Sequence, residues 1–424
     1  MSTPMRATGP APHRWRGLIA LLAANGLAWT GTRLASLAVP WFVLSTTGSA
    51  LQTGLVVFAQ MAPYVLAQAL SGPLIDRIGP KRISVLGDVV VAVAMGAIPL
   101  LHASGTLSLP LLMLLLAVVG AAEGPANSAK SVFVPDVTTR AGVPLERTTG
   151  LLGTVERTAS TLGPAIGGVL IGAWGGSGTL AVTAVLAAVS ACLTALALPD
   201  SRGEDAGTDA HPPTGYFARL KHGFGFIRGD SLLLAIYCMV AITNLLDGAM
   251  FSILMPLWVM DRGLGPEFLG LLAAVLSGAS IASSLVAAAW GHRLPRRLVY
   301  LGGFFLAGAP RFLVLALGAG VPAILGTYLI AGLGSGFLNP IIGALQFERI
   351  PRTMLGTVRG LGTAISWAGI PFGGLLGGAL VTAFGLMKAL LISGAAYFVT
   401  TTLPGLLPQW AGMRGGKDTP AERN

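Results

Sequence analysis

Long apolar runs, each about as long as a membrane crossing, constrain the fold of this chain more than any other feature. Such runs lie between polar breaks at residues 17–43, 51–73, 83–103, 108–129, 148–173, 178–198, 231–259, 266–290, 298–318, 322–346, 356–382 and 386–408. A crossing helix needs about 20 apolar residues, and the short alternating segments of a membrane barrel do not occur. Because lipid cannot bond to the backbone, each run must form a helix. We therefore expect an all-α membrane protein with twelve transmembrane helices.

Composition excludes several other classes. Charged residues make up 10% of the chain, where soluble proteins carry about a quarter. Both cysteines, Cys192 and Cys238, lie in apolar runs, so neither a disulfide framework nor a thiolate metal site is expected. The five histidines show no metal-binding spacing. The spans hold no nucleophile–base or metal constellation, and no phosphate-binding GxxxxGK[ST] loop occurs. The sequence thus predicts no metal, no ATP site and no enzyme.

The basic residues indicate the orientation in the membrane. With a cytoplasmic N-terminus, 22 of the 27 Lys and Arg residues fall on the cytoplasmic side of the twelve predicted spans. Only Arg262 and Lys388 fall outside, and the remaining three lie within spans. This division is the positive-inside pattern, so both termini are expected in the cytoplasm. Topology and lipid contact account for the net charge of +10, and no nucleic-acid partner is needed.

The chain divides into two similar halves. A polar segment at 200–214 separates six spans from six, which predicts a bundle at 1–199, a cytoplasmic linker at 200–225, a second bundle at 226–410 and a cytoplasmic tail at 411–424. A shift of 215 places Pro80 on Pro295, and a shift of 216 places "VPWFVL" from Val39 on "MPLWVM" from Met255. "GPAIGG" and "GIPFGG" recur near the end of each half. These echoes predict two pseudo-symmetric six-helix bundles.

The loop after the second predicted span resembles the signature of the major facilitator superfamily. The matching positions are Gly72, Asp76, Arg77, Gly79, Lys81 and Arg82, whereas the second-half copy has Gly291 in place of the acid. In the fifth span, Gly163, Pro164, Gly167 and Gly168 resemble the antiporter motif of drug-exporting members, with Ala159 replacing one glycine. The strings "LAVPWFVLSTTGSA" and "GPANSAKSVFVPDV" are similar to a bacterial branch that exports macrolides and siderophores.

This resemblance implies alternating access and export of small lipophilic or amphipathic compounds in exchange for protons. We therefore expect a monomeric, multi-pass protein of the bacterial inner membrane, in contact with lipids and driven by the proton gradient without a cofactor. Two alternatives are a dedicated exporter of one metabolite, such as a siderophore or a self-made antibiotic, and a lipid flippase without proton coupling. A narrow substrate range would distinguish the dedicated exporter from a multidrug exporter. Dispensability of the intramembrane acids would favour the flippase.

Acids within the spans are the proton-coupling candidates, because an ionisable group in lipid needs a partner, water or a function. Asp247 in span seven ranks first, with permanent pairing to an arginine as the alternative. Arg33 in span one, at similar depth on the equivalent helix, is its expected partner. Glu156 ranks second for proton coupling, with a structural ion pair as the alternative. Arg157 points about 100° away from Glu156 on the same helix, so we expect one in the cavity and the other against a neighbouring helix.

Other charges are expected to support the signature loop. Glu123 is a third proton candidate, but the sequence favours a role in bracing Asp76 and Arg77, and Asp88 should join the same network. Arg77 would lock the cytoplasmic side, whereas Lys81 and Arg82 are equally well explained by topology. Arg311 is expected to snorkel or to be paired, without a transport role.

Aromatic and amide side chains on cavity-facing helices could hold a flat amphipathic compound. Each is also compatible with simple packing or with bonding between helices, and the sequence does not decide between these roles. These candidates are Trp29, Tyr64, Asn127, Asn244, Phe251, Trp258, Phe337, Asn339, Trp367 and Phe372.

Overall fold

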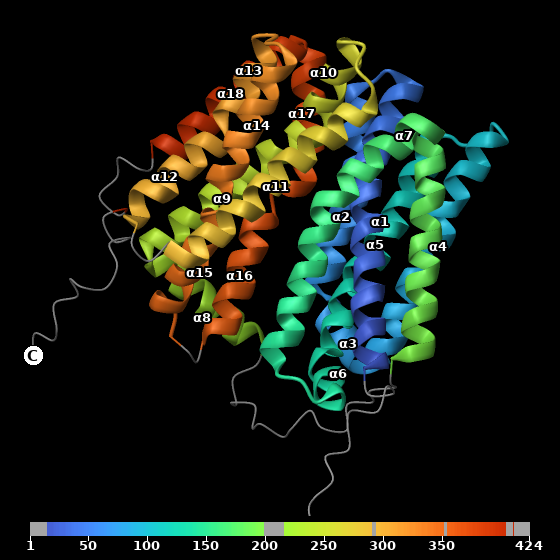
Figure 1. The fold of residues 1–424 in the computed structure, drawn as a ribbon, viewed down its shortest axis with the longest axis vertical. Coiled ribbons are helices and arrows are strands. Elements are labelled where there is room, and N and C mark those ends of the chain that lie inside the picture. Colours follow the sequence, from blue (N-terminus) through green and yellow to red (C-terminus); the bar gives the residue numbers. More distant parts are fainter. Residues whose placement is uncertain (1–14, 199–215, 291–293, 352–353, 404–409, 411–424) are drawn as a thin grey trace, which may run out of the picture. The chain divides into compact units, whose positions relative to one another are not determined.

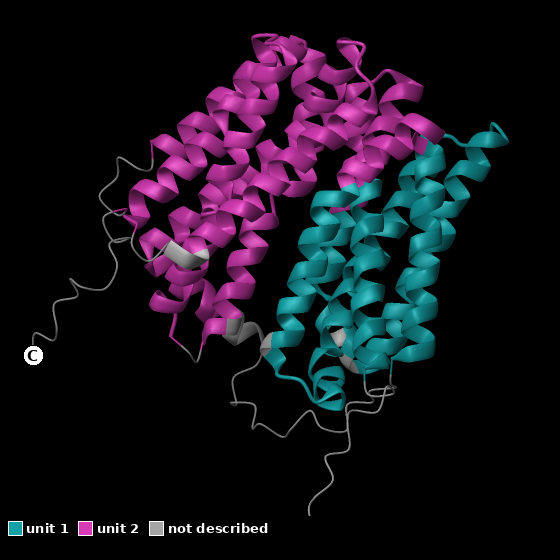
Figure 2. Cartoon of the chain, viewed as in Figure 1, with its two compact units in different colours: residues 1–35, 62–163, 177–207 teal, residues 36–61, 164–176, 208–424 magenta. Residues whose placement is uncertain are grey.

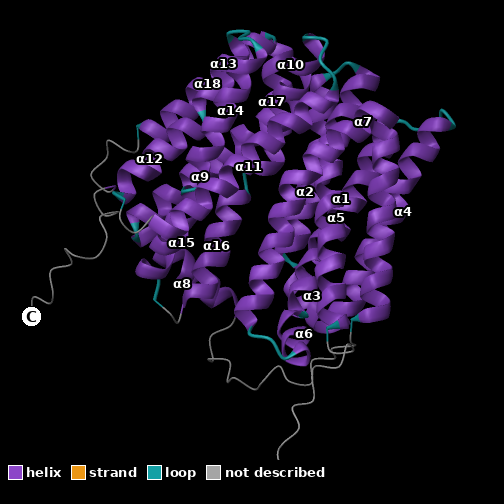
Figure 3. Ribbon diagram, in the orientation of Figure 1, coloured by secondary structure: helices purple, strands orange, loops and turns teal. Residues whose placement is uncertain are grey.

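The computed structural model describes residues 15–198, 216–290, 294–351, 354–403 and 410, and these residues form helices and turns without a strand (Figures 1 and 3). The all-α prediction is confirmed. The helices are α1 (Arg16–Thr47), α2 (Ala50–Ala69), α3 (Ser71–Ile78), α4 (Pro80–Ala103), α5 (Leu109–Val132), α6 (Val134–Ala141), α7 (Leu145–Ala197), α8 (Tyr216–Gly229), α9 (Ser231–Ala249), the π-helical turn η1 (Met250–Leu254), α10 (Met255–Asp261), α11 (Pro266–Trp290), α12 (Arg296–Ala307), α13 (Ala309–Ala316), α14 (Val321–Ser335), α15 (Leu338–Arg349), α16 (Leu355–Trp367), α17 (Ile370–Phe384) and α18 (Leu386–Thr402).

Within these described ranges, nine helical stretches are long and apolar enough to cross a membrane. One of them belongs to α7, which is 53 residues long and turns at Gly175, where the backbone has a φ of 72°. A positive φ suits glycine because it has no Cβ. The turn divides α7 into two helices that match the predicted spans 148–173 and 178–198. The count of twelve spans stays a prediction.

The contacts divide the chain into two compact units (Figure 2). Unit 1 comprises residues 1–35, 62–163 and 177–207, and unit 2 comprises 36–61, 164–176 and 208–424. Unit 2 therefore contains two pieces of the predicted first bundle. One of them approaches α17 closely, since the carbonyl of Gly374 leaves no room for a Cβ on Gly54. Within the predicted linker 200–225, α8 begins at Tyr216; residues 200–215 lie outside the described residues, and the bounds of the linker stay a prediction.

Around the signature loop, α3 ends at Ile78 and α4 begins at Pro80. The turn depends on Gly79, whose φ is 94°. Proline suits the first position of a helix because its missing N–H has no partner there in any case. The repeat recurs in the second half, where α12 begins at Arg296 directly after Pro295. Arg77 and Arg82 are exposed, while the side chain of Asp76 and residue Gly291 lie outside the described residues.

Candidate functional site

A closed charge cluster joins α4, α5 and α7 in unit 1. Gly87 allows the first two helices to approach, because a Cβ on it would lie 2.6 Å from the Cβ of Ala126. The next residue of α4, Asp88, thereby meets Lys130, one turn beyond Ala126, at 2.8 Å between Oδ1 and Nζ. Ser190 of α7 donates to the other carboxylate oxygen at 2.6 Å. The side chains of Lys130 and Asp88 are 0% and 7% exposed, so the ion pair is enclosed by protein.

This cluster bears on two sequence predictions. Asp88 was expected in the network of the signature loop; the structure pairs it with Lys130, and a contact with the loop stays a prediction because the side chain of Asp76 lies outside the described residues. Lys130 was counted among the cytoplasmic loop cations because the fourth predicted span ends at residue 129. Helix α5 continues to Val132, which carries Lys130 into the bundle. The close approach of α4 and α5 at Gly87 sets this partner, and no local pattern in the sequence indicates that approach.

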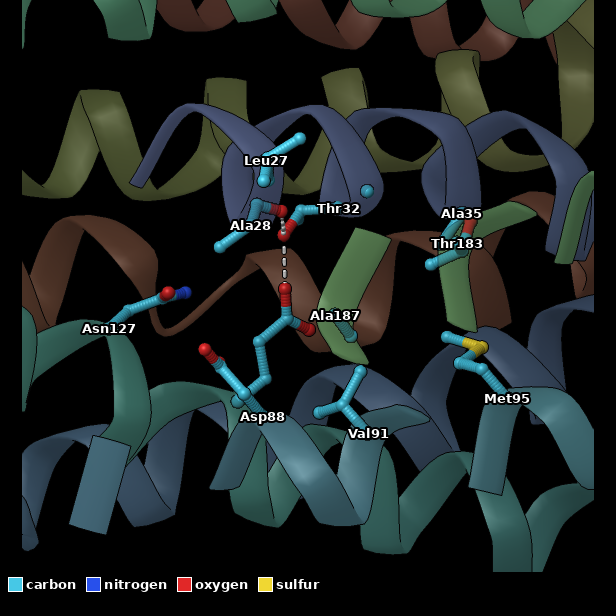
Figure 4. A pocket seen from close by; sticks show the side chains of 12 residues that line it. Leu27, Ala28, Thr32, Ala35, Asp88, Val91, Met95, Asn127, Thr183 and Ala187 are labelled. Carbon is cyan, nitrogen blue, oxygen red and sulfur yellow. Dashed lines mark hydrogen bonds between the residues drawn. The ribbon is translucent and has the colours of Figure 1, made fainter. Parts of the chain in front are cut away.

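Glu123 of α5 has a different kind of partner. Its carboxylate accepts a hydrogen bond from the hydroxyl of Thr32 on α1 (Figure 4). The same hydroxyl lies 3.0 Å from the carbonyl oxygen of Ala28. No described Lys or Arg forms an ion pair with Glu123. The structure thus shows a contact of Glu123 with α1. The expected role in bracing Asp76 and Arg77 stays a prediction, because the side chain of Asp76 lies outside the described residues.

A small cavity of about 20 Å³ lies beside this contact (Figure 4). We call it the first-half pocket, and its lining residues are Leu27, Ala28, Gly31, Thr32, Ala35, Asp88, Val91, Met95, Glu123, Asn127, Thr183 and Ala187. A polar cavity of this size has room for a single water molecule. Such a water would have carboxylate, hydroxyl and amide groups as partners.

A second ion pair lies within unit 2. Arg311 of α13 donates from Nη2 to Oδ1 of Asp247 on α9 at 2.7 Å. The arginine side chain is 4% exposed, and that of Asp247 is 29% exposed. The sequence predicted Arg33 as the partner of Asp247. The structure shows Arg311 as a partner of this acid, and a pair with Arg33, which belongs to unit 1, stays a prediction. Of the two expectations for Arg311, snorkelling and pairing, the structure shows pairing.

Local breaks in the helices position this pair. Gly308 interrupts the helical backbone between α12 and α13. The ring of Tyr397 on α18 occupies the space that a Cβ at Gly308 would need. Arg311 follows within the first turn of α13, where Pro310 suits the helix start. On the other side, α9 passes into the π-helical turn η1 directly after Ala249. Such turns are frequent at functional sites.

The Asp247–Arg311 pair opens on a cavity of about 260 Å³, which we call the second-half pocket. Its wall combines amides and hydroxyls with apolar and aromatic side chains. The lining residues are Val240, Thr243, Asn244, Asp247, Phe251, Leu276, Ser280, Phe304, Ala307, Arg311, Ser335, Leu338, Asn339, Ile342 and Tyr397. Three of the predicted cavity residues, Asn244, Phe251 and Asn339, therefore lie beside Asp247.

The two pockets occupy equivalent positions in the two halves. A shift of 216, close to the shift found in the sequence, carries eight of the twelve residues of the first-half pocket onto residues of the second-half pocket. The equivalent pairs are Leu27 and Thr243, Ala28 and Asn244, Gly31 and Asp247, Ala35 and Phe251, Asp88 and Phe304, Val91 and Ala307, Met95 and Arg311, and Glu123 and Asn339. Each half thus places its charges at positions that are uncharged in the other.

Other predicted residues lie elsewhere. Trp258 was a cavity candidate, but it is 4% exposed in the core of unit 2 and donates from Nε1 to the carbonyl of Leu315 at 2.9 Å. Phe337 lines a separate cavity, and Phe372 packs against Phe58 at 5.4 Å between ring centroids. Trp367 is exposed, and Trp29 and Tyr64 are partly buried. A role of these residues in substrate binding stays a prediction.

The antiporter motif lies at close helix contacts. A Cβ on Gly163 would lie 2.7 Å from that of Arg33 within unit 1, and one on Gly168 would lie 2.8 Å from the carbonyl oxygen of Pro266 within unit 2. Glu156 and Arg157 are both exposed on the helix surface. The motif residues thus permit packing, and proton coupling through Glu156 stays a prediction.

Comparisons with known proteins agree on the family. The model of the Major Facilitator Superfamily matches residues 21–265 and 238–411. The multidrug efflux pump Tap of Mycobacterium tuberculosis is 30% identical over 371 residues, which cover 86% of this chain and 87% of that protein. Macrolide efflux protein A of Streptococcus pyogenes is 22% identical over 378 residues, covering 88% and 91%.

Solved structures show the same fold at low identity. The nucleoside transporter NupG, as its D323A mutant, has a TM-score of 0.76 at 12% identity and covers 94% of this chain and 99% of its own. A bacterial homologue of the human lysosomal transporter Spinster, inward-facing and unoccupied, has a TM-score of 0.72 at 16% identity, covering 97% and 100%. The family model and the relative at 30% identity confirm the resemblance seen in the signature loop.

Proposed function

The chain belongs to the major facilitator superfamily, and on that premise we propose that this multi-pass membrane transporter exports small amphipathic drugs in exchange for protons. The relatives named for multidrug and macrolide efflux cover most of the chain, which supports drug export. The observation that carries proton coupling is the Thr32–Glu123 contact beside a cavity the size of one water molecule. The charge division of the loops supports a cytoplasmic location for both termini.

Glu123 is the acid whose proton can exchange. Asp88 and Asp247 are each held in an ion pair, with Lys130 and with Arg311 respectively, so a proton that binds either acid has to break that pair. Glu123 forms no such ion pair with a described residue. It therefore replaces Asp247 as the leading proton carrier.

The hydroxyl of Thr32 gives this acid a simple switch. A hydroxyl has one proton to donate, but that of Thr32 lies within bonding distance of both Glu123 and the carbonyl of Ala28. When Glu123 is ionised, Thr32 donates to it. When Glu123 is protonated, the acid itself donates to the Thr32 oxygen, and the hydroxyl turns to Ala28. Protonation thus changes the contact between α1 and α5, which couples proton binding to the position of α1.

Inverted membrane vesicles with an acid-inside gradient and a pH-quenched dye test this proposal. Macrolides, lipophilic cations and siderophores would be added in turn. We expect several of them to release protons from vesicles that carry the natural protein, and Glu123→Gln to abolish the release. Glu348→Gln is the matched control, because its carboxylate lies in an exposed pair with Arg296 at 2.8 Å. Undiminished release by Glu123→Gln contradicts the assignment of the proton carrier.

The same assay separates the alternatives. If only one compound triggers proton release from the vesicles, the protein is a dedicated exporter. Absence of release by all compounds, with the protein folded and in the membrane, indicates a flippase or another transporter without proton coupling.

A further inference from the structure

We propose that the second-half pocket recognises a neutral polar group of the substrate, one that offers both a hydrogen-bond donor and an acceptor, and that it discriminates against permanent cations. This inference rests on the proposed export function for the presence of a substrate, and it assigns the chemistry that one pocket of unit 2 selects. It follows from the charge of the pocket, from one unpartnered atom and from the composition of the wall.

The charges that line the pocket cancel. Asp247 is the only carboxylate and Arg311 the only basic side chain of the lining, and they pair at 2.7 Å. A permanent cation that enters would leave an excess positive charge in a partly dry site, where charge is costly unless it is paired. It would also face the guanidinium directly, because the Arg311 carbon Cζ lies 5.6 Å from the ring centroid of Phe251 and so covers that aromatic face. A neutral polar group avoids both costs.

Arg311 has one donor without a partner. Its residue is 3% exposed, and its Nε is a buried polar atom that makes no hydrogen bond with the described residues. A buried N–H that lacks a partner is unfavourable, so a ligand with an acceptor at this position gains a bond that the free protein does not make. Asp247 supplies the complementary acceptor, since only one of its oxygens is bound to Arg311 and its side chain is 29% exposed.

The rest of the wall suits an amphipathic molecule. Ser335 donates to Ser280 at 3.1 Å, while Phe304 and Leu338 provide apolar surface in the same lining. A primary amide, or a hydroxyl beside a carbonyl, combines the donor and acceptor that Asp247 and Arg311 require. The volume of about 260 Å³ is large enough for such a group and a ring attached to it.

Equilibrium binding to the purified protein in detergent tests the proposal without any proton gradient. The probes are chloramphenicol, which is neutral and has an amide and hydroxyls, and tetraphenylphosphonium, a cation without hydrogen-bonding groups. We expect the natural protein to bind chloramphenicol more tightly. Arg311→Gln removes the positive charge and leaves Asp247 unpaired. The affinity for chloramphenicol should therefore fall and the affinity for tetraphenylphosphonium should rise, each by about tenfold.

Two further variants complete the test. Arg311→Lys keeps the charge but removes Nε. It should lower the affinity for chloramphenicol and leave the affinity for tetraphenylphosphonium unchanged, and it provides the test if Arg311→Gln does not fold. Arg349→Gln breaks another arginine–aspartate pair of unit 2, the one with Asp230 at 2.7 Å, and should alter neither affinity.

An unchanged ratio of the two affinities in both Arg311 variants would overturn the proposal, as would tighter binding of the cation by the natural protein. Because binding is measured without a gradient, failure of proton coupling leaves these results intact. If vesicle transport is lost in Glu123→Gln but unchanged in the Arg311 variants, the proposed function stands and substrate recognition by the second-half pocket is rejected.

Discussion

The first-half and second-half pockets occupy equivalent places in the two halves, yet they treat charge in opposite ways. In the first, the Asp88–Lys130 pair is enclosed, and a separate acid, Glu123, makes no ion pair with a described residue and lies beside a cavity of about 20 Å³. In the second, the Asp247–Arg311 pair itself faces a cavity of about 260 Å³. The two repeated halves thus have a pocket at equivalent positions, but the side chains that line it differ in charge.

The difference teaches how one fold can separate two tasks. A site that binds only a proton needs no room for a ligand, whereas a site that binds an organic molecule needs volume and a polar anchor. The contrast can be assigned to single positions. Met95 in the first half corresponds to Arg311 in the second, and Gly31 corresponds to Asp247. The following predictions test how far the two pockets differ.

Breaking the enclosed pair should have the largest effect. Lys130→Ala leaves Asp88 charged and buried without its cation, which we expect to cost roughly 3–5 kcal/mol of unfolding free energy. Thermal unfolding in detergent, together with the yield of folded protein, measures the loss. The double variant Asp88→Asn with Lys130→Met removes both charges and should recover much of the stability. A Lys130→Ala protein as stable as the natural one would show that the pair is not essential.

Breaking the open pair should cost less. Arg311→Ala leaves Asp247 unpaired, but its side chain reaches the pocket, where water can solvate it, so we expect a loss of about 1–3 kcal/mol. The same unfolding measurement applies, with Arg349→Ala as the control for an arginine pair outside the pocket. If Arg311→Ala proves more damaging than Lys130→Ala, the distinction between an enclosed and an open pair fails.

Removing the switch hydroxyl should affect transport more than stability. Thr32→Val keeps the shape of the side chain but cannot donate to Glu123, and the loss of one hydrogen bond corresponds to roughly a five- to tenfold lower rate of drug-induced proton release. Thr32→Ser retains the hydroxyl and should stay near the natural rate. Equal rates in the two variants would argue that the contact only fastens α1 to α5.

The smallest effect is expected at Asn244. Its amide donates to the carbonyl of Ser366 on α16 at 2.8 Å, so one of its N–H groups fastens two helices. Asn244→Ala introduces the residue found at the equivalent position, Ala28, and should lower the unfolding free energy by about 0.6 kcal/mol. A large change in chloramphenicol affinity without a change in stability would instead assign Asn244 to ligand binding.

Much of the fold could be predicted from local patterns. The apolar runs indicated helices throughout, the Gly79–Pro80 turn of the signature loop separates α3 from α4, and the repeat shift relates the two pockets. The boundary of α5 was less accessible, because a lysine at a helix end resembles a loop cation in sequence. Its burial depends on the close approach at Gly87, which has no local sequence signal of its own.

The class of molecule followed from the residues alone, since the preference of each residue for lipid or water acts locally and adds up along a span. The family, and the acids that lie within apolar runs, could likewise be found from the residues. Which acid has a cation became visible only in the folded chain, because an ion pair depends on a few ångströms between helices distant in the chain. The approach of α4 to α5 assigns Lys130 to Asp88, and the break at Gly308 precedes the turn that brings Arg311 to Asp247. Glu123 is left to the hydroxyl of Thr32.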